Sequence, residues 1–220
     1  MTNLDPLLER NRAFATTGAH TGLSMMPNQP IFVVTCLDPR VDPAAFLGVG
    51  LGDAPVVRNA GGRITDAVID DIAFISYLAG TILGDGPLFE VAVIHHTNCG
   101  MEFFTDDVMR DLLASSLETA ELGAQGFRDV GKGPGSAEGQ FIDWLTIKDA
   151  KQAVVDDVTR IRRHALVPKK IPIYGYIYDV KTGRLVEVEE ATRAGRVDES
   201  TRARRVDEVE VPTQESPLTT

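Results

Sequence analysis

Three short segments of the chain predict strands. They are residues 31–36, 55–58 and 88–94, of which the first and the last are mostly apolar runs without polar alternation. A strand covered on both faces has this pattern, because neither face meets water. Between the second and third segments, residues 66–79 repeat apolar side chains at helical spacing, with Thr65 as the expected N-cap. The order strand, helix, strand predicts a βαβ unit whose crossover helix is buried.

The second half of the chain adds helices and a hairpin. Helical patterns occur within residues 104–122 and 149–165, and a Gly-rich stretch separates them. Residues 173–180 and 185–188 are joined by Lys-Thr-Gly, which predicts a β-hairpin. We therefore expect an α/β fold in three layers, with a parallel-dominated β-sheet flanked by helices and a C-terminal β-hairpin.

The two ends of the chain differ from this central region. Residues 4–15 carry Leu4, Leu7, Leu8 and Phe14 among charged residues, which predicts an N-terminal helical arm lying on its own domain or on a neighbouring subunit. The sequence Thr-Arg-Ala-Gly-Arg-Val-Asp-Glu at 192–199 recurs, with one change, at 201–208. Two copies are too few for a solenoid. We expect a single domain over residues 1–190 and a polar, mobile tail over residues 191–220, or an arm that orders on a partner.

Composition and charge narrow the class of protein. The 220 residues are 43% hydrophobic and 25% charged, as in globular proteins, and the net charge of -10 provides no basic surface for nucleic acid. The longest apolar stretch, residues 72–84, is shorter than the ~18 to 20 residues of a membrane span. Two cysteines are too few for a disulfide scaffold, and the first residues, Met-Thr-Asn-Leu-Asp, lack the basic-then-apolar pattern expected of a secretory signal. We expect a cytoplasmic protein that binds neither nucleic acid nor membrane.

Both cysteines follow predicted buried strands. Cys36 begins Cys-Leu-Asp-Pro-Arg, and Cys99 ends His-His-Thr-Asn-Cys. In open α/β sheets, ligand sites lie at the carboxyl ends of the strands. Two thiolates and the imidazole of His96 suit zinc, and three protein ligands leave one position of a tetrahedron for water or substrate. The alternatives are that the cysteines only pack in the core or form a redox pair, although neither belongs to a Cys-x-x-Cys motif.

These motifs together resemble those of the β-class carbonic anhydrases. The resemblance rests on Cys36-x-Asp38-x-Arg40, on Arg-Asn-Ala-Gly-Gly at 58–62, and on His96-x-x-Cys99-Gly, and it is strong over residues 31–101. It implies one zinc ion per chain on Cys36, His96 and Cys99, a catalytic dyad of Asp38 and Arg40, and homodimers or assemblies of dimers. The sequence departs from many members at two positions, where Pro39 replaces a small residue and His95 replaces glycine.

The activity implied by the resemblance is the reversible hydration of carbon dioxide to bicarbonate by a zinc-bound hydroxide. Asp38 would accept the proton of the hydroxide in a hydrogen bond, and Arg40 would keep Asp38 ionised and away from the metal. The same fold and ligands occur in enzymes that hydrolyse carbonyl sulfide or carbon disulfide, which is the alternative function. A zinc protein without catalytic activity, its fourth position closed by Asp38, is a third possibility.

Several further residues are assigned by their position. The resemblance places the turn of Asn59, Ala60 and Gly61 at the border of the substrate pocket. We interpret His95 as a packed or solvated residue at the end of a strand and not as a proton shuttle. No motif surrounds two other histidines, which we expect at the surface: His20 and His164.

Overall fold

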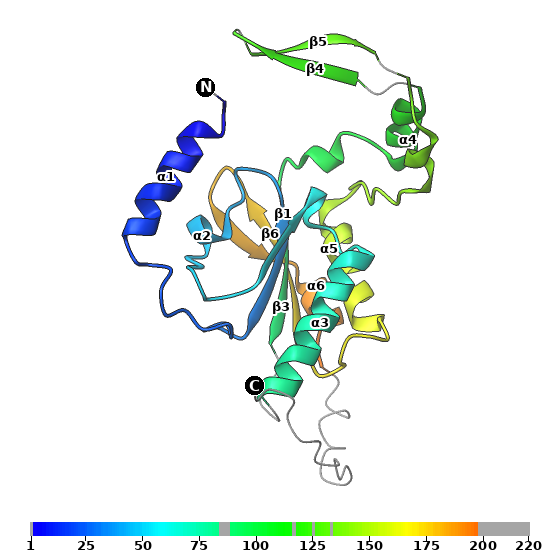
Figure 1. Ribbon diagram of the computed structural model, residues 1–220. Coiled ribbons are helices and arrows are strands. Elements are labelled where there is room, and N and C mark those ends of the chain that lie inside the picture. Colours follow the sequence, from blue (N-terminus) through cyan, green and yellow to red (C-terminus); the bar gives the residue numbers. More distant parts are fainter. Residues whose placement is uncertain (1, 84–88, 116–117, 125, 133, 198–220) are drawn as a thin grey trace.

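A five-stranded sheet forms the centre of the protein (Figure 1). The computed structural model describes residues 2–83, 89–115, 118–124, 126–132 and 134–197. The strand order is β2-β1-β3-β6-β7, in which the first four strands are parallel and β7 is antiparallel to β6. The strands are β1 (Ile31–Cys36), β2 (Val56–Asn59), β3 (Glu90–His96), β6 (Ile173–Asp179) and β7 (Arg184–Glu187). The predicted α/β class, its parallel-dominated sheet and its C-terminal hairpin are confirmed.

The helices flank this sheet unequally. The α-helices are α1 (Asp5–Thr16), α2 (Pro43–Phe46), α3 (Asp66–Leu83), α4 (Asp106–Ser115), α5 (Ala150–Arg163) and α6 (Glu189–Ala194). Short 3-10 helices are η1 (Ala60–Gly62), η2 (Gly100–Glu102) and η3 (Ala137–Phe141), and β4 (Glu118–Gly123) pairs with β5 (Gly126–Lys132) as a separate hairpin. Apolar residues of α3, α5 and α6 share one core with the sheet, whereas Phe46 of α2 packs on the opposite face.

The structure corrects three details of the predicted elements. The helix at 66–79 is buried on one face only, because Phe74 and Tyr77 are 63% and 74% exposed. The helical segment expected within 104–122 ends at Ser115, and β4 occupies the positions after residue 117. The third strand extends to His96, two residues beyond the predicted end, because both histidine side chains are buried and the pairing with β6 continues.

The start of the predicted mobile tail is also wrong. Residues 189–194 form α6, and within it Ala191 and Thr192 are buried. The Thr192 hydroxyl accepts a hydrogen bond from the Gly175 amide, at 3.4 Å, so the first copy of the repeat begins in the packed domain. The second copy at 201–208 lies outside the described residues, as does all of the predicted tail from residue 198 onward.

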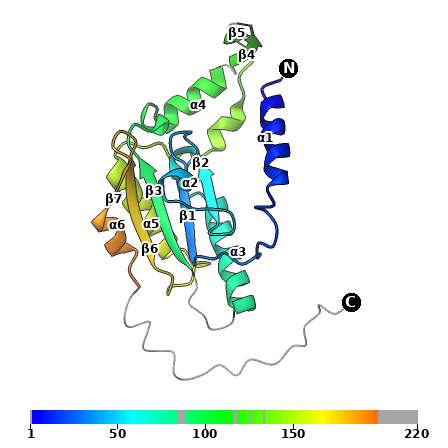
Figure 2. The ribbon, with the colours of Figure 1, turned by 90° about the vertical axis from the view of Figure 1, so that its left-hand side faces the viewer.

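Helix α1 lies beside the body of the domain, as Figures 1 and 2 show from two directions. None of its residues is buried, and the four large apolar side chains that defined the predicted arm are all exposed. Among the described residues, no helix is long and apolar enough to cross a membrane.

Candidate metal centre

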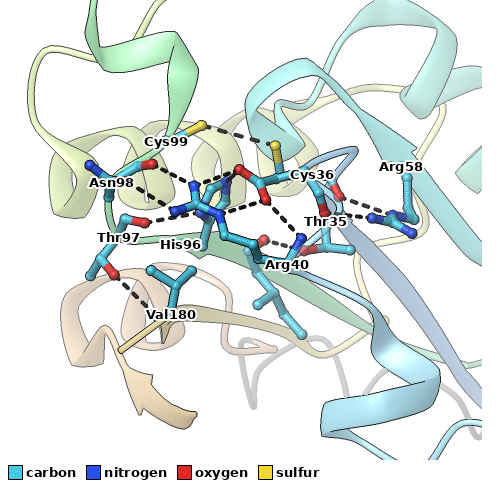
Figure 3. A network of polar contacts seen from close by, with 11 residues as sticks. Thr35, Cys36, Arg40, Arg58, His96, Thr97, Asn98, Cys99 and Val180 are labelled. Atoms are coloured by element: carbon cyan, nitrogen blue, oxygen red, sulfur yellow. Dashed lines mark hydrogen bonds and ion pairs between the residues drawn. The ribbon is translucent and has the colours of Figure 1, made fainter. Parts of the chain in front are cut away.

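The carboxyl ends of β1 and β3 bring the three predicted metal ligands together (Figure 3). Cys36 is the last residue of β1, His96 is the last residue of β3, and Cys99 lies in the turn that follows β3. The parallel register pairs Thr35 with Ile94, so the two strands end at the same edge of the sheet. All three ligand residues are buried, and their donor atoms lie within 4.8 Å of one another.

The geometry of these donors fits a tetrahedral zinc ion. Two sulfurs that are each ~2.3 Å from zinc lie ~3.8 Å apart at the tetrahedral angle. The Sγ atoms of Cys36 and Cys99 are 3.9 Å apart. The Nδ1 atom of His96 lies 3.0 Å from the Thr97 carbonyl oxygen, which fixes the proton on Nδ1. His96 Nε2 is buried, faces the site, and has no hydrogen-bond partner among the described residues, as a ligand atom requires.

The charges at the site also suit a divalent cation. The hydrogen bond from Cys99 lowers the pKa of Cys36 to about 4, and the same contact raises the pKa of Cys99. Burial acts to lower the pKa of His96, but the adjacent Cys36 thiolate outweighs it and raises that pKa. The neighbours of Cys36 thus favour its thiolate, which is the form of cysteine that binds a metal ion.

Asp38 and Arg40 form a bidentate ion pair beside the ligands. Arg40 donates from Nε to Asp38 Oδ1 at 2.9 Å and from Nη2 to Asp38 Oδ2 at 2.7 Å. The hydrogen bond from Arg40 holds the pKa of Asp38 well below its usual range, so Asp38 is a carboxylate at neutral pH. Its Oδ2 atom lies only 3.9 Å from His96 Nε2. The two members predicted for the dyad are thus paired, with the carboxylate next to the metal ligands.

Two arginines hold the loop after β1 through hydrogen bonds that the sequence did not reveal. Arg58, at the end of β2, donates from Nε to the Cys36 carbonyl at 3.0 Å and from Nη2 to the Asp38 carbonyl at 2.8 Å. Arg40 also donates from Nη1 to Asn98 Oδ1 at 3.0 Å and from Nη2 to the Asn98 carbonyl at 2.9 Å. Arg58 had a signal in the sequence, since it directly precedes the Asn-Ala-Gly-Gly turn, whereas Asn98 had none.

The Asn59 turn packs directly behind the ligands. The Asn59 amide closes the turn, because its Nδ2 donates to the Arg63 carbonyl at 2.7 Å and its Oδ1 accepts from the Arg63 amide at 2.8 Å. Gly62 has φ +67°, and a Cβ atom there would lie 3.0 Å from the Cys36 nitrogen, so glycine is required for this approach. Ala60 is exposed and Gly61 is buried. That Asn59, Ala60 and Gly61 border the substrate pocket stays a prediction.

A buried ion network lies on the other side of β3. His95 Nε2 is 2.9 Å from Asp157 Oδ2, and Arg63 donates to the same carboxylate from Nε at 2.7 Å and from Nη2 at 3.2 Å. Burial acts to raise the pKa of Asp157, but the hydrogen bonds from His95 and Arg63 outweigh it and lower that pKa. His95 is therefore a packed structural residue at the end of a strand, as the sequence predicted.

The sequence contained a signal for this network that the pattern analysis missed. Asp157 is a charged residue on the buried face of α5, among positions that are otherwise apolar. A charge is fully buried almost only when it is paired, so its position implied a buried cation. The other two histidines lie as expected at the surface, with His20 exposed and His164 partly exposed.

Apolar side chains line the side of the metal centre next to α5. Ile147 and Ala153 are buried against the two cysteines, and Met101 and Ala150 pack around them. A groove of ≈ 610 Å³ runs along this wall, and Ile147 and Ala150 also line it. The ligands are thus bordered by a charged pair on one side and by an apolar surface on another.

Comparison with known proteins assigns the chain to a class. The family model described as carbonic anhydrase matches residues 31–185. The chain belongs to the β-carbonic anhydrase family, as the motifs around Cys36 and Cys99 predicted.

Particular relatives carry two different activities. β-Carbonic anhydrase 1 of Mycobacterium tuberculosis is 32% identical over 188 residues, which cover 86% of this chain and 99% of the relative. Carbon disulfide hydrolase of an Acidianus species is 32% identical over 165 residues, 72% of this chain and 76% of the relative. The crystal structure of carbonic anhydrase from Streptococcus mutans superposes with a TM-score of 0.68 at 32% identity and covers 86% of this chain and 98% of that one. All three are enzymes of one family, to which this chain belongs.

Proposed function

We propose that this protein catalyses the reversible hydration of carbon dioxide to bicarbonate with one zinc ion per chain, held by Cys36, His96 and Cys99. The observation that carries the proposal is the set of three buried donor atoms within 4.8 Å, next to the Asp38–Arg40 pair. A structural zinc site has four protein ligands, whereas three protein ligands and an adjacent acid are typical of a catalytic site. The similarity to mycobacterial β-carbonic anhydrase 1 supports the choice of reaction.

The chain's own residues have defined tasks in this reaction. Zinc supplies a nucleophile derived from water near neutral pH. Asp38, ionised because Arg40 lowers its pKa, accepts the proton of that nucleophile in a hydrogen bond and directs the lone pair at the substrate carbon. Arg40 holds the carboxylate in place, so that Asp38 does not itself occupy the fourth position. The apolar wall at Ile147 excludes water from one side and suits a small, linear, uncharged substrate.

One experiment separates this function from its alternatives. A purified sample of known zinc content is assayed in parallel with carbon dioxide, carbonyl sulfide and carbon disulfide. We expect carbon dioxide to be turned over fastest. Faster hydrolysis of carbon disulfide or carbonyl sulfide would favour the second candidate function, which the 32% identity to carbon disulfide hydrolase supports. A zinc-loaded protein inactive on all three substrates would favour a non-catalytic role.

The dyad makes a separate prediction. Arg40→Ala should retain zinc, because Arg40 contacts no ligand atom directly, but should lower kcat about a hundredfold, since the freed carboxylate of Asp38 can then bind the metal. The measurement is kcat for carbon dioxide together with zinc content. Arg163→Ala is the matched control, because Arg163 is exposed in the last turn of α5 and should leave kcat unchanged. Near-normal turnover in Arg40→Ala would show that the pair is purely structural.

We also propose that the protein is a homodimer or an assembly of dimers, in which α1 covers a neighbouring subunit. The support is the absence of any buried residue on α1 together with its exposed apolar side chains. The double change Leu7→Asp and Leu8→Asp should shift the mass measured by sedimentation velocity to that of a smaller species. Asn11→Asp, a polar substitution on the same helix, is the control. An unchanged mass in the leucine variant would rule out α1 as the interface.

The two unpaired cysteines support a cytoplasmic location.

A further inference from the structure

The Arg40 guanidinium connects the two loops that carry the metal ligands. Arg40 lies in the loop after β1 and donates to both carboxylate oxygens of Asp38 in the same loop. It also donates twice to Asn98, which lies in the turn after β3. Figure 3 shows Arg40 between Cys36 and Asn98, with His96 behind it. The planar guanidinium has five N–H donors, so it can donate to the Asp38 carboxylate and to Asn98 at the same time.

Asn98 has the backbone that this contact requires. Its φ is +58°, in the left-handed region, which asparagine adopts more readily than most residues with a side chain. In this conformation the side-chain oxygen and the carbonyl oxygen of one residue both accept from Arg40, at 3.0 and 2.9 Å. Asn98 thus offers Arg40 two acceptor oxygens, directly before the predicted ligand Cys99.

The ion pair alone would hold Asp38 loosely. The Arg40 side chain is 47% exposed, and water competes for an exposed pair of this kind. Asp38 Oδ2 is only 3.9 Å from His96 Nε2, so a small movement of the carboxylate brings it to the metal. The position of the Asp38 carboxylate therefore depends on the other contacts that fix the Arg40 guanidinium.

We propose that Asn98 is a positioning residue that anchors Arg40 and so keeps Asp38 from closing the fourth position of the metal. The inference rests on the zinc site and the dyad of the proposed function. Without the amide oxygen, Arg40 keeps only the main-chain acceptor on this side and gains freedom to leave Asp38. Asn98 then determines the fraction of sites that are open to substrate.

The test replaces Asn98 by two residues that tolerate the left-handed backbone. Asn98→Gly keeps the main-chain acceptor and removes Oδ1, whereas Asn98→Asp keeps a side-chain acceptor for Arg40. Cobalt(II) is the probe, because its visible spectrum changes when an acidic side chain replaces water as the fourth ligand. We expect the spectrum of Asn98→Gly to move towards that of Arg40→Ala, and kcat of the zinc form to fall about tenfold, as the loss of one hydrogen bond to a charged group predicts. Asn98→Asp should restore both properties.

A double variant identifies the ligand responsible. If Asp38 causes the spectral change, Asn98→Gly combined with Asp38→Asn should lack it. The inference is overturned if Asn98→Gly leaves the spectrum and kcat unchanged, if the change persists in the double variant, or if Asn98→Gly loses the metal, since Asn98 would then support the Cys99 turn instead. The cobalt spectra also separate this inference from the proposed function, because they report closure by Asp38 even if the wild type turns over none of the three substrates.

Discussion

Replacing either cysteine by alanine is expected to remove the zinc and the activity together. Cys36→Ala or Cys99→Ala leaves two protein ligands for the metal, too few for a stable site. Zinc measured by atomic absorption should fall from about one per chain to a small fraction, and turnover of carbon dioxide should fall on the order of a thousandfold, because the nucleophile at neutral pH depends on the metal.

Loss of the fold is the alternative reason for inactivity in these variants, and it can be measured. Both cysteines are buried, but alanine removes only one sulfur atom, so circular dichroism of the variants should remain that of the wild type. Thr35→Ser, a conservative change at the residue before Cys36, is a control that should retain the metal. Full zinc retention in both cysteine variants would contradict the ligand assignment.

Asp157→Ala is expected to have the largest effect on stability. The change leaves the guanidinium of Arg63 buried without its carboxylate and removes the partner of His95. Breaking a buried ion pair by removing one partner costs about 3 to 5 kcal/mol. For a chain of this size, that loss lowers Tm by roughly 10 °C. The free energy of unfolding in urea and the thermal midpoint, both measured on the zinc-loaded protein, test the prediction.

The neighbouring Asp156 provides the control for this experiment. Asp156 lies on the exposed side of α5, and among the described residues its carboxylate accepts a hydrogen bond only from Gln152. Asp156→Ala should therefore change stability by less than about 1 kcal/mol. Equal effects of the two substitutions would show that the buried network contributes nothing specific.

The contribution of Asp157 should also depend on pH with a defined sign. Its pKa in the folded protein is lowered relative to the unfolded chain, so the unfolded state binds the proton more readily. The stability that Asp157 contributes is fully present above the unfolded pKa of about 3.9 and is lost as the pH falls through the folded value. The difference between wild type and Asp157→Asn should therefore be constant at neutral pH and should shrink in acid.

Some elements were predictable from the chain because their cause is local. Residues 31–36 match β1 at both ends, since an uninterrupted β-branched run fits only a strand covered on both faces. The sequence also pointed to Cys36, His96 and Cys99, which the structure brings within 4.8 Å of one another, because the two cysteines occur only in motifs that follow buried strands. The exposed side of α3 was not predicted, because helical periodicity alone does not show how much of a helix a neighbouring layer covers.

The sequence by itself determined the class of fold and predicted both the Cys36, His96 and Cys99 cluster and the pairing of Asp38 with Arg40, since these depend on residue types and short spacings. Only the tertiary structure decided what holds them in place. Asn98 lies 58 residues from Arg40, and Asp157 lies 94 from Arg63, so no local pattern relates them. Such pairs form where parallel strands end side by side and a helix packs against them. Their geometry is fixed by the packing of the whole sheet, and a charge buried there is stable only because that packing brings its partner within hydrogen-bond distance.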